Sequence, residues 1–272
     1  MARAKWGQNF LVDDNVARKC VAALNLGAEG SDPGSVLEIG PGKGALTKHL
    51  LALPAARLAA VEIDRDLAAI LRSKYGHLPR FFLHNQDFLE TDIGALHLGS
   101  AFKVISNLPY AVCAPILQKL LAMPGWQSLV VMLQKEVADR ICAAPGQKSY
   151  GLLSISVQVQ GVARKLFAVP RGCFRPAPRV ESAVLQITPL PKPFLKESQQ
   201  AQFFKVVRAA FAHRRKTVLN SLTQSLRQEN ISESLQRCGI DPQIRAEQIS
   251  VPQFCQLSKA LSPKDKGMEK NF

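Results

Sequence analysis

The stretch that decides the fold is SVLEIGPGKGALT, residues 35–47, an apolar strand that passes through three glycines into a helix. Glycines let the backbone approach a ligand closely, and the start of the helix offers unpaired N–H groups. The next predicted strand, 58–61, is followed by Glu62, whose carboxylate could accept hydrogen bonds from both hydroxyls of a ribose. Taken alone, the spacing of Gly40, Gly42 and Ala45 fits a nicotinamide dinucleotide and S-adenosylmethionine equally well.

Two further strands end in polar residues and decide between these cofactors. Residues 80–84 form a predicted strand followed by Asp87, a carboxylate that could reach an adenine amino group. Residues 102–105 form another, followed by Asn107. A nucleoside fits across such a row, in the crevice outside the carboxyl ends of parallel strands. S-adenosylmethionine has no pyrophosphate, so its site does not need the later glycine of a dinucleotide fingerprint. The row therefore favours S-adenosylmethionine.

The segment SNLPY, residues 106–110, carries the chemistry that we expect at this edge. The Asn107 amide and the carbonyls of Leu108 and Pro109 could accept hydrogen bonds from an exocyclic amino group, while Tyr110 could stack on the base. This arrangement suits a reaction at the amine of adenine or cytosine. The alternative is an ordinary turn in which Asn107 caps the backbone and Tyr110 packs on the sheet.

Composition limits the class of protein and its partners. The chain has 272 residues, of which 47% are hydrophobic, enough for one large core and a second, smaller one. Its net charge of +14 predicts a polyanionic partner, RNA or DNA, with a membrane surface as the competing explanation. No apolar run approaches the roughly 18 residues of a spanning helix. The six cysteines are scattered without a zinc-type spacing, so we expect a cytoplasmic protein with reduced thiols and no metal site.

The middle of the chain continues the alternation of strands and helices. Predicted helices cover 115–123 and 135–142, and predicted strands cover 128–133, 153–160 and 183–187, the last two paired. The proline-rich loop 174–182 could press Phe174 onto a splayed base while Arg175 and Arg179 hold phosphate. The alternative places Phe174 in the core.

After a proline-rich linker, residues 189–193, only helices are predicted: 199–212, 216–226, 233–238 and 252–261. We therefore expect a first domain over 1–188, a helical domain over 194–261 and a disordered tail over 262–272. The chain from 190 onward holds 14 Lys+Arg against 7 Asp+Glu. Arg214, Arg215 and Lys216 form a candidate phosphate-binding patch, unless they are an ordinary solvated helix junction.

Short motifs along nearly the whole chain resemble the KsgA (RsmA) family of small-subunit ribosomal RNA adenine dimethyltransferases. The motifs are Gly7-Gln8-Asn9-Phe10-Leu11, Glu38-Ile39-Gly40-Pro41-Gly42, Glu62-Ile63-Asp64, Gln86-Asp87, Asn107-Leu108-Pro109-Tyr110, Gln134-Lys135-Glu136-Val137, Phe174-x-Pro176-x-Pro178-x-Val180-x-Ser182, Arg214-Arg215-Lys216-Thr217, Gly239-Ile240-Asp241-Pro242 and Arg245-Ala246-Glu247. DNA adenine and protein glutamine methyltransferases share the tetrapeptide at 107–110, so the combination carries the resemblance. The carboxy-terminal motifs favour this family over enzymes that methylate large-subunit RNA.

The resemblance implies an α/β, Rossmann-like methyltransferase fold with a seven-stranded, mostly parallel sheet that has one reversed strand, joined to a small all-helical domain that binds RNA. It implies dimethylation of N6 on two adjacent adenosines in the 3′-terminal hairpin of small-subunit RNA, and a monomer that acts on a pre-30S-type particle. The implied roles are as follows: Asn9, Leu11, Gly40, Gly42, Glu62, Asp87 and Asn107 bind S-adenosylmethionine, Asn107, Leu108, Pro109, Tyr110 and Phe174 serve catalysis, and Tyr110 and Phe174 stack on the target base. An RNA-binding assembly factor without activity, a large-subunit RNA methyltransferase and a dehydrogenase remain alternatives.

Overall fold

The computed structural model describes residues 8–26, 34–53, 57–228 and 230–262. The chain forms two compact units, one built from residues 1–142 and 161–190 and the other from 143–160 and 191–272. The division differs from the domains expected from sequence, because residues 143–160 group with the helical unit. Tyr150, Ile155 and Val159 explain this grouping, since all three are buried in the core of that unit and the Tyr150 hydroxyl donates to the Ile249 carbonyl at 3.0 Å.

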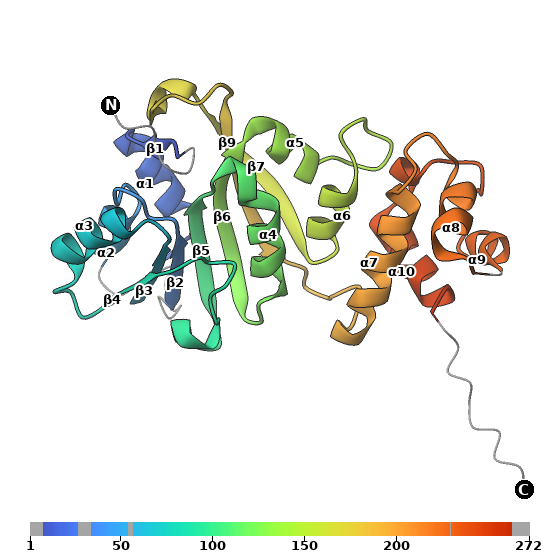
Figure 1. Ribbon diagram of the computed structural model, residues 1–272, viewed down its shortest axis with the longest axis horizontal. Helices are drawn as coiled ribbons and strands as arrows, with labels where there is room; N and C mark the ends of the chain where they lie inside the picture. Colours follow the sequence, from blue (N-terminus) through green and yellow to red (C-terminus); the bar gives the residue numbers. More distant parts are fainter. Residues whose placement is uncertain (1–7, 27–33, 54–56, 229, 263–272) are drawn as a thin grey trace, which may run out of the picture. The chain divides into compact units, whose positions relative to one another are not determined.

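The first unit is built on a seven-stranded sheet, which Figure 1 shows with its helices. In spatial order the strands are β4 (Phe81–Asn85), β3 (Arg57–Glu62), β2 (Ser35–Ile39), β5 (Phe102–Asn107), β6 (Trp126–Gln134), β9 (Ser182–Pro189) and β7 (Gly161–Val169). Neighbours from β4 to β6 are parallel, and β9 is antiparallel to both β6 and β7. The expectation of a mostly parallel sheet with one reversed strand is confirmed, and β9 is that strand.

Apolar runs account for the central strands. Val36 and Leu37 of β2 and Val104 of β5 have no exposed surface, as expected for parallel strands that are covered on both faces. The connecting helices are α1 (Asp14–Ala22), α2 (Thr47–Ala52), α3 (Arg65–Tyr75), α4 (Cys113–Ala122) and α5 (Lys135–Ile141), with short 3-10 turns at η1 (Gly94–Leu96), η2 (Tyr110–Val112) and η3 (Arg171–Cys173). Side chains fix two helix starts: Asp13 accepts from Val16 N, and Asp64 accepts from Asp66 N and Leu67 N.

The strand order brings the polar strand ends to one edge of the sheet. β2 lies between β3 and β5, and its last residue, Ile39, pairs with Val61 on one side and Ser106 on the other. Three neighbouring strands therefore end at one level, where Gly40 follows β2, Glu62 ends β3 and Asn107 ends β5. This is the point where the strand order reverses, and the place where open α/β sheets bind ligands.

The predicted strand over residues 153–160 is wrong, because this segment forms the helix α6 (Leu152–Gln158). Its apolar residues alternate with serines, which resembles a strand with one wet face. In the structure Ser154, Ser156 and their apolar neighbours are buried together, and the Ser156 hydroxyl donates to the Leu152 carbonyl at 2.7 Å. A serine that bonds to its own helix tolerates burial, so here the alternation did not mark a strand.

Besides β6, the strand β7 pairs with β9. The sequence analysis did not predict β7. Its exposed Val162 and Leu166 and its charged residues hide the period-2 pattern, and the pairing register shifts between Lys165 and Phe167. An irregularity of this kind reverses the side-chain alternation in mid-strand.

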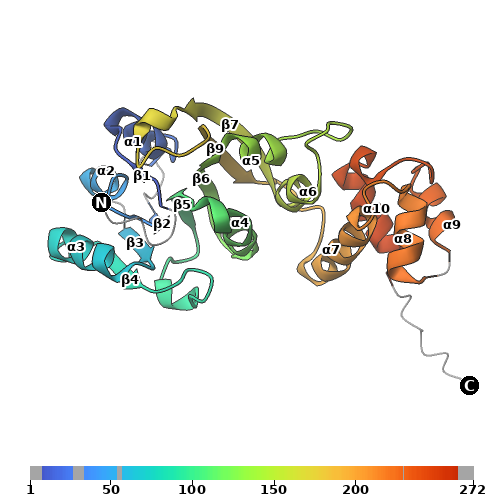
Figure 2. The ribbon, with the colours of Figure 1, turned by 45° about the horizontal axis from the view of Figure 1, so that its top comes forward.

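The second unit is helical, as expected. It contains α6, α7 (Glu197–Phe211), α8 (Val218–Leu226), α9 (Ile231–Arg237), the turn η4 (Ala246–Gln248) and α10 (Val251–Ala260), and both ribbon views show α7 beside α8 and α10 (Figures 1 and 2). Phe203, Leu222 and Phe254 lie fully buried in its core. Within the described ranges no helix is both long and apolar enough to cross a membrane. The expected tail lies, apart from Ser262, outside the described residues.

Candidate active site at the carboxyl edge of the sheet

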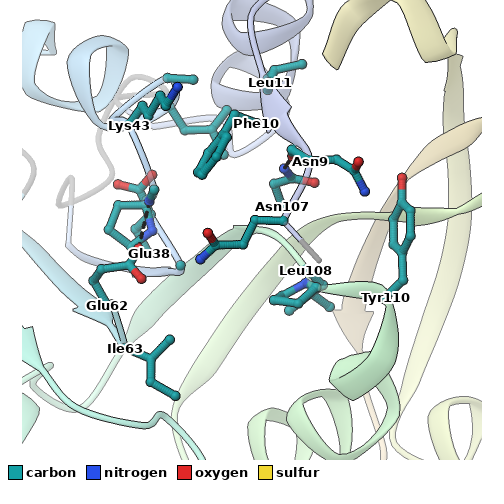
Figure 3. A pocket seen from close by; sticks show the side chains of 17 residues that line it. Asn9, Phe10, Leu11, Glu38, Lys43, Glu62, Ile63, Asn107, Leu108 and Tyr110 are labelled. Atoms are coloured by element: carbon teal, nitrogen blue, oxygen red, sulfur yellow. Dashed lines mark hydrogen bonds between the residues drawn. The ribbon is translucent and has the colours of Figure 1, made fainter. Parts of the chain in front are cut away.

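A pocket lies at the carboxyl ends of β2, β3 and β5 (Figure 3). Its lining includes Asn9, Leu11, Gly40, Gly42, Glu62, Asn107, Leu108, Pro109 and Tyr110, all predicted site residues. It also includes Gln8, Phe10, Glu38, Pro41, Lys43, Ala45, Leu46 and Ile63, which the sequence analysis did not assign. In the close-up, Glu62 and Tyr110 lie on opposite sides of Asn107 (Figure 3).

Glu62 is held in place by the glycine loop. Its Oε2 accepts a hydrogen bond from Gly42 N at 2.8 Å and its Oε1 accepts one from Asp64 N at 3.0 Å. The positive φ of Gly42, +59°, turns that N–H toward the carboxylate, and a Cβ there would lie 3.3 Å from the Phe10 ring. Burial raises the pKa of Glu62, which is 1% exposed. Each carboxylate oxygen keeps a lone pair for a ribose hydroxyl, so the residues present fit the sugar of a nucleoside.

Glu38 lines the pocket with a buried carboxyl that has one unpaired oxygen and a raised pKa. The sequence analysis gave it no role beyond its motif. Its Oε2 accepts from the Thr47 hydroxyl at 2.8 Å, while its Oε1 is buried and has no hydrogen-bond partner among the residues that the structure describes. Burial raises the pKa of this carboxyl to about 8, despite the bond from Thr47. A buried acceptor without a partner is costly, so Oε1 fits a hydrogen-bond donor on a bound cofactor.

We expect Glu38→Gln to make stability depend less on pH. An unfolded glutamate loses its proton around pH 4.5, whereas folded Glu38 keeps its proton up to about pH 8. Over this interval the folded state binds more protons than the unfolded state, so rising pH lowers wild-type stability. Thermal unfolding of the free protein between about pH 5 and pH 8 should show a flatter Tm profile for Glu38→Gln than for wild type. Glu136→Gln, on an exposed residue of α5, is the matched control, and equal profiles for all three proteins would contradict the account.

An amino-terminal segment, residues 8–12, lies beside the glycine loop, residues 40–44, and is called the strap below. Its strand β1 (Phe10–Leu11) pairs with β8 (Phe174–Arg175), and Val12 N donates to the Cys173 carbonyl at 2.8 Å. The Lys43 ammonium lies 4.7 Å from the centre of the Phe10 ring. The sequence analysis gave Phe10 and Lys43 no role in the pocket, because neither residue type is typical of a nucleoside site. Both residues are adjacent in sequence to predicted site residues.

Asn107 is oriented by the strap. Its Nδ2 donates to the Asn9 carbonyl at 3.0 Å, and Oδ1 accepts no hydrogen bond from the residues that the structure describes. The next residue is anchored to the sheet, because Leu108 N donates to the Met132 carbonyl at 2.9 Å. Tyr110 follows on η2, half-buried at the side of the pocket. The structure therefore brings together the amide, a main-chain carbonyl and an aromatic ring.

Two predicted site residues are not in this pocket. Asp87 follows β4 at the same edge of the sheet but is absent from the lining, and its Oδ1 accepts from Leu89 N at 2.8 Å. Phe174 has no exposed surface and packs in the core of the first unit with Leu11 and Val169. The geometry therefore corrects the expectation that Phe174 stacks on the target base, because pairing of β8 with β1 places the residue inside.

The predicted RNA-binding residues are on the surface. Arg175 is exposed at the end of β8 and Arg179 is exposed in the loop between β8 and β9, and Arg175 Nη1 donates to the Gly172 and Phe174 carbonyls. Arg214, Arg215 and Lys216 are exposed between α7 and α8, and Lys216 Nζ donates to Gln224 Oε1 at 2.6 Å. Within the described part of the chain no ion pair neutralises these three cations.

Comparisons with known proteins identify the family of this chain. The model of the family described as ribosomal RNA adenine dimethylase matches residues 1–262. A protein of Caldanaerobacter subterraneus subsp. tengcongensis named ribosomal RNA small subunit methyltransferase A is 40% identical over 265 residues, which cover 96% of this chain and 97% of that protein. A protein of the same name from Lactiplantibacillus plantarum is 42% identical over 271 residues, covering 95% and 90%.

Among solved structures, a dimethyladenosine transferase from Plasmodium falciparum superposes with a TM-score of 0.75 at 24% identity, covering 91% of this chain and 95% of that one. At this identity the likeness concerns the fold, which is the Rossmann-like fold expected from the sequence. The family match over most of the chain, together with relatives of 40% identity or more, shows that the chain belongs to the ribosomal RNA adenine dimethylase family.

Proposed function

We propose that the protein transfers methyl groups from S-adenosylmethionine to N6 of two adjacent adenosines in the 3′-terminal hairpin of small-subunit ribosomal RNA. The observation that carries this proposal is the pair formed by Asn107 and Tyr110 at one side of a pocket whose other side carries Glu62. The first side offers an acceptor and a ring to an aminated base, and the second offers a carboxylate to a ribose. Relatives named small subunit methyltransferase A support this substrate over large-subunit RNA.

The cofactor is held by this chain's own polar groups. Glu62 accepts hydrogen bonds from the ribose, Gly40 and Gly42 allow close approach of the backbone, and Glu38 Oε1, the unpaired oxygen of a carboxyl that keeps its proton up to about pH 8, forms a hydrogen bond with a polar group of the cofactor. Asn9 and Leu11 cover the pocket from the strap. S-adenosylmethionine, when bound, supplies an electrophilic methyl group on a sulfonium. Asp87 remains a proposed partner of the adenine amine only if the loop after β4 moves toward the pocket.

The reaction needs acceptors rather than a strong base, because adenine N6 is barely basic and its lone pair is delocalised into the ring. In the first transfer Asn107 Oδ1 and a main-chain carbonyl would accept the two N6–H bonds and favour the pyramidal nitrogen of the transition state, and in the second transfer one N6–H bond remains to be accepted. In each transfer the N–C bond would form as the S–C bond breaks, which leaves S-adenosylhomocysteine, and the proton lost from N6 would pass to solvent. The Pro109 carbonyl already accepts from Val112 N at 3.2 Å, so the Leu108 carbonyl is the better second acceptor. Tyr110 stacks on the base and holds N6 in line for attack.

The proposal extends to the partner and the state of the protein. We propose a pre-30S-type particle as the substrate, a monomeric cytoplasmic enzyme and a reaction without metal. An inactive assembly factor would not need the acceptor at Asn107 or the carboxylate at Glu62. The direct test incubates the protein with labelled S-adenosylmethionine and, in parallel reactions, unmethylated small subunits and unmethylated large subunits. Label in the small-subunit RNA supports the proposal, and label confined to large subunits would overturn it.

We expect Arg214, Arg215 and Lys216 to bind RNA phosphates. Replacing all three with Ala should weaken binding to small subunits and reduce the slope of log affinity against log salt by roughly 0.7–0.9 for each phosphate that the variant no longer neutralises. Affinity for S-adenosylmethionine should not change, and methylation should recover at saturating RNA if these residues only bind.

The matched control replaces Lys165, Lys192 and Lys196, exposed cations outside residues 214–216, with Ala. This control loses the same net charge. If both triple variants lower the slope equally, overall charge rather than a defined patch binds RNA. A wild-type slope in the first variant would move the RNA-binding surface elsewhere, with Arg175 and Arg179 as the next candidates.

A further inference from the structure

The hydroxyl of Tyr110 is tied to a residue far along the chain. Tyr110 Oη lies 2.6 Å from Ser182 Oγ, a hydrogen bond that spans 72 positions in sequence. Ser182 ends the proline-rich motif that begins at Phe174, and neither the sequence analysis nor the proposed mechanism gave it a role. The bond joins η2, which follows the end of β5 at the pocket, to the start of β9, which does not line the pocket.

Ser182 is fixed more firmly than most side chains near the pocket. It has no exposed surface, and its backbone pairs with Gln134 of β6 on one side and Val169 of β7 on the other. The residue before it is also held, because Lys135 N donates to the Glu181 carbonyl at 3.0 Å. The backbone of Ser182 therefore has a position set by three strands, and Oγ can move only by rotation about χ1 unless the sheet itself shifts.

Tyr110 has much weaker support of its own. It begins η2, a single 3-10 turn that buries none of its residues and has no side-chain cap. The backbone is anchored two residues earlier, by the bond from Leu108 N to Met132 O. A ring on such a turn keeps side-chain freedom that a base would have to restrict on binding. The bond at the hydroxyl removes this freedom in advance.

We infer that Ser182 is a positioning residue for methyl transfer, which acts through the Tyr110 hydroxyl and does not touch the substrate. It holds the ring at the side of Asn107, where the ring can receive the target base. This inference rests on the proposed function. It gives the Tyr110 hydroxyl a role in holding the ring, and stacking alone does not require this hydroxyl.

The test is a double-mutant cycle of Ser182→Ala and Tyr110→Phe, measured as single-turnover methylation of unmethylated small subunits. Each variant should slow transfer by about 2- to 10-fold, the range of one neutral hydrogen bond, with affinity for S-adenosylmethionine unchanged. The double variant should be no slower than either single variant, because both remove the same bond. Effects that multiply in the double variant, or a wild-type rate for Ser182→Ala, would overturn the inference.

Ser221→Ala is the matched control. Ser221 is equally buried, and its Oγ donates to the Ala209 carbonyl at 2.8 Å in the helical unit. Loss of this hydroxyl should lower Tm without changing the transfer rate. If Ser221→Ala slowed transfer as much as Ser182→Ala at a similar loss of Tm, the effect would be one of stability, and the inference would fail.

A second readout needs no substrate. The chain has three tyrosines, so the ultraviolet titration of wild type minus that of Tyr110→Phe isolates the Tyr110 hydroxyl. Burial raises its pKa and the bond from Ser182 lowers it, so Ser182→Ala should move the titration to higher pH. An unmoved titration would overturn the contact. If wild type transferred no methyl group while the titration still moved, the proposed function and the positioning role would fail, but the contact would stand.

Discussion

Asn107→Ala should slow methyl transfer by about 10²- to 10³-fold, the loss seen when one preorganised polar group is removed from a transition state. In the proposed mechanism Asn107 Oδ1 accepts an N6–H bond that strengthens only as the nitrogen becomes pyramidal. Binding of RNA should fall little, because we propose that exposed arginine and lysine side chains outside the pocket make most of the RNA contacts. Single-turnover methylation and equilibrium RNA binding, measured on the same preparation, separate these two effects.

The control for this variant is Asn107→Asp. Aspartate keeps an acceptor oxygen at the same place but cannot donate to the Asn9 carbonyl, which Asn107 Nδ2 reaches at 3.0 Å. We expect its rate to lie between those of wild type and Asn107→Ala. If the alanine variant lost RNA binding and transfer to the same extent, Asn107 would be a structural residue that holds the strap.

Glu62→Ala should weaken binding of S-adenosylmethionine by roughly 5- to 150-fold, since a buried polar group that loses its partner costs about 1–3 kcal/mol. Two groups lose that partner, the ribose of the cofactor and Gly42 N, which donates to Glu62 Oε2 at 2.8 Å. Titration calorimetry on the free protein measures the effect without RNA.

The matched control is Glu90→Ala, an exposed glutamate in the turn after β4. It removes the same charge and should leave the dissociation constant unchanged. A wild-type dissociation constant for Glu62→Ala would remove this carboxylate from the cofactor site and would favour a ligand bound elsewhere.

Much of this site could be predicted because its residues follow strands that are unmistakable in sequence. The runs that end at Ile39, Val61 and Ile105 are mostly apolar, with Glu38 and Lys103 as the charged exceptions, and parallel strands bring their carboxyl ends to one edge. Glu62 and Asn107 therefore had to meet once the strand order was known. The resemblance to a family implied a mostly parallel sheet with one reversed strand, but the strand order itself comes from the structure.

What could not be predicted depends on pairings between distant segments. Phe174 is buried because β8 pairs with β1, a contact of two residues in each strand without a pattern of its own. The helix α6 and the strand β7 were misjudged because small polar residues and an irregular register altered their periodicity. The role inferred for Ser182 depends on a hydrogen bond across 72 positions, and its motif identifies the residue but not its partner.

The measurement that tests the central claim most directly is the map of modified nucleotides. Unmethylated small subunits are incubated with labelled S-adenosylmethionine and either the wild-type protein or Asn107→Ala, and the RNA is then digested and analysed by mass spectrometry. The account predicts N6,N6-dimethyladenosine at two adjacent positions of the 3′-terminal hairpin with wild type, and little or none with the variant. Methyl groups on another base or at another atom of adenine, or equal modification by both proteins, would contradict it.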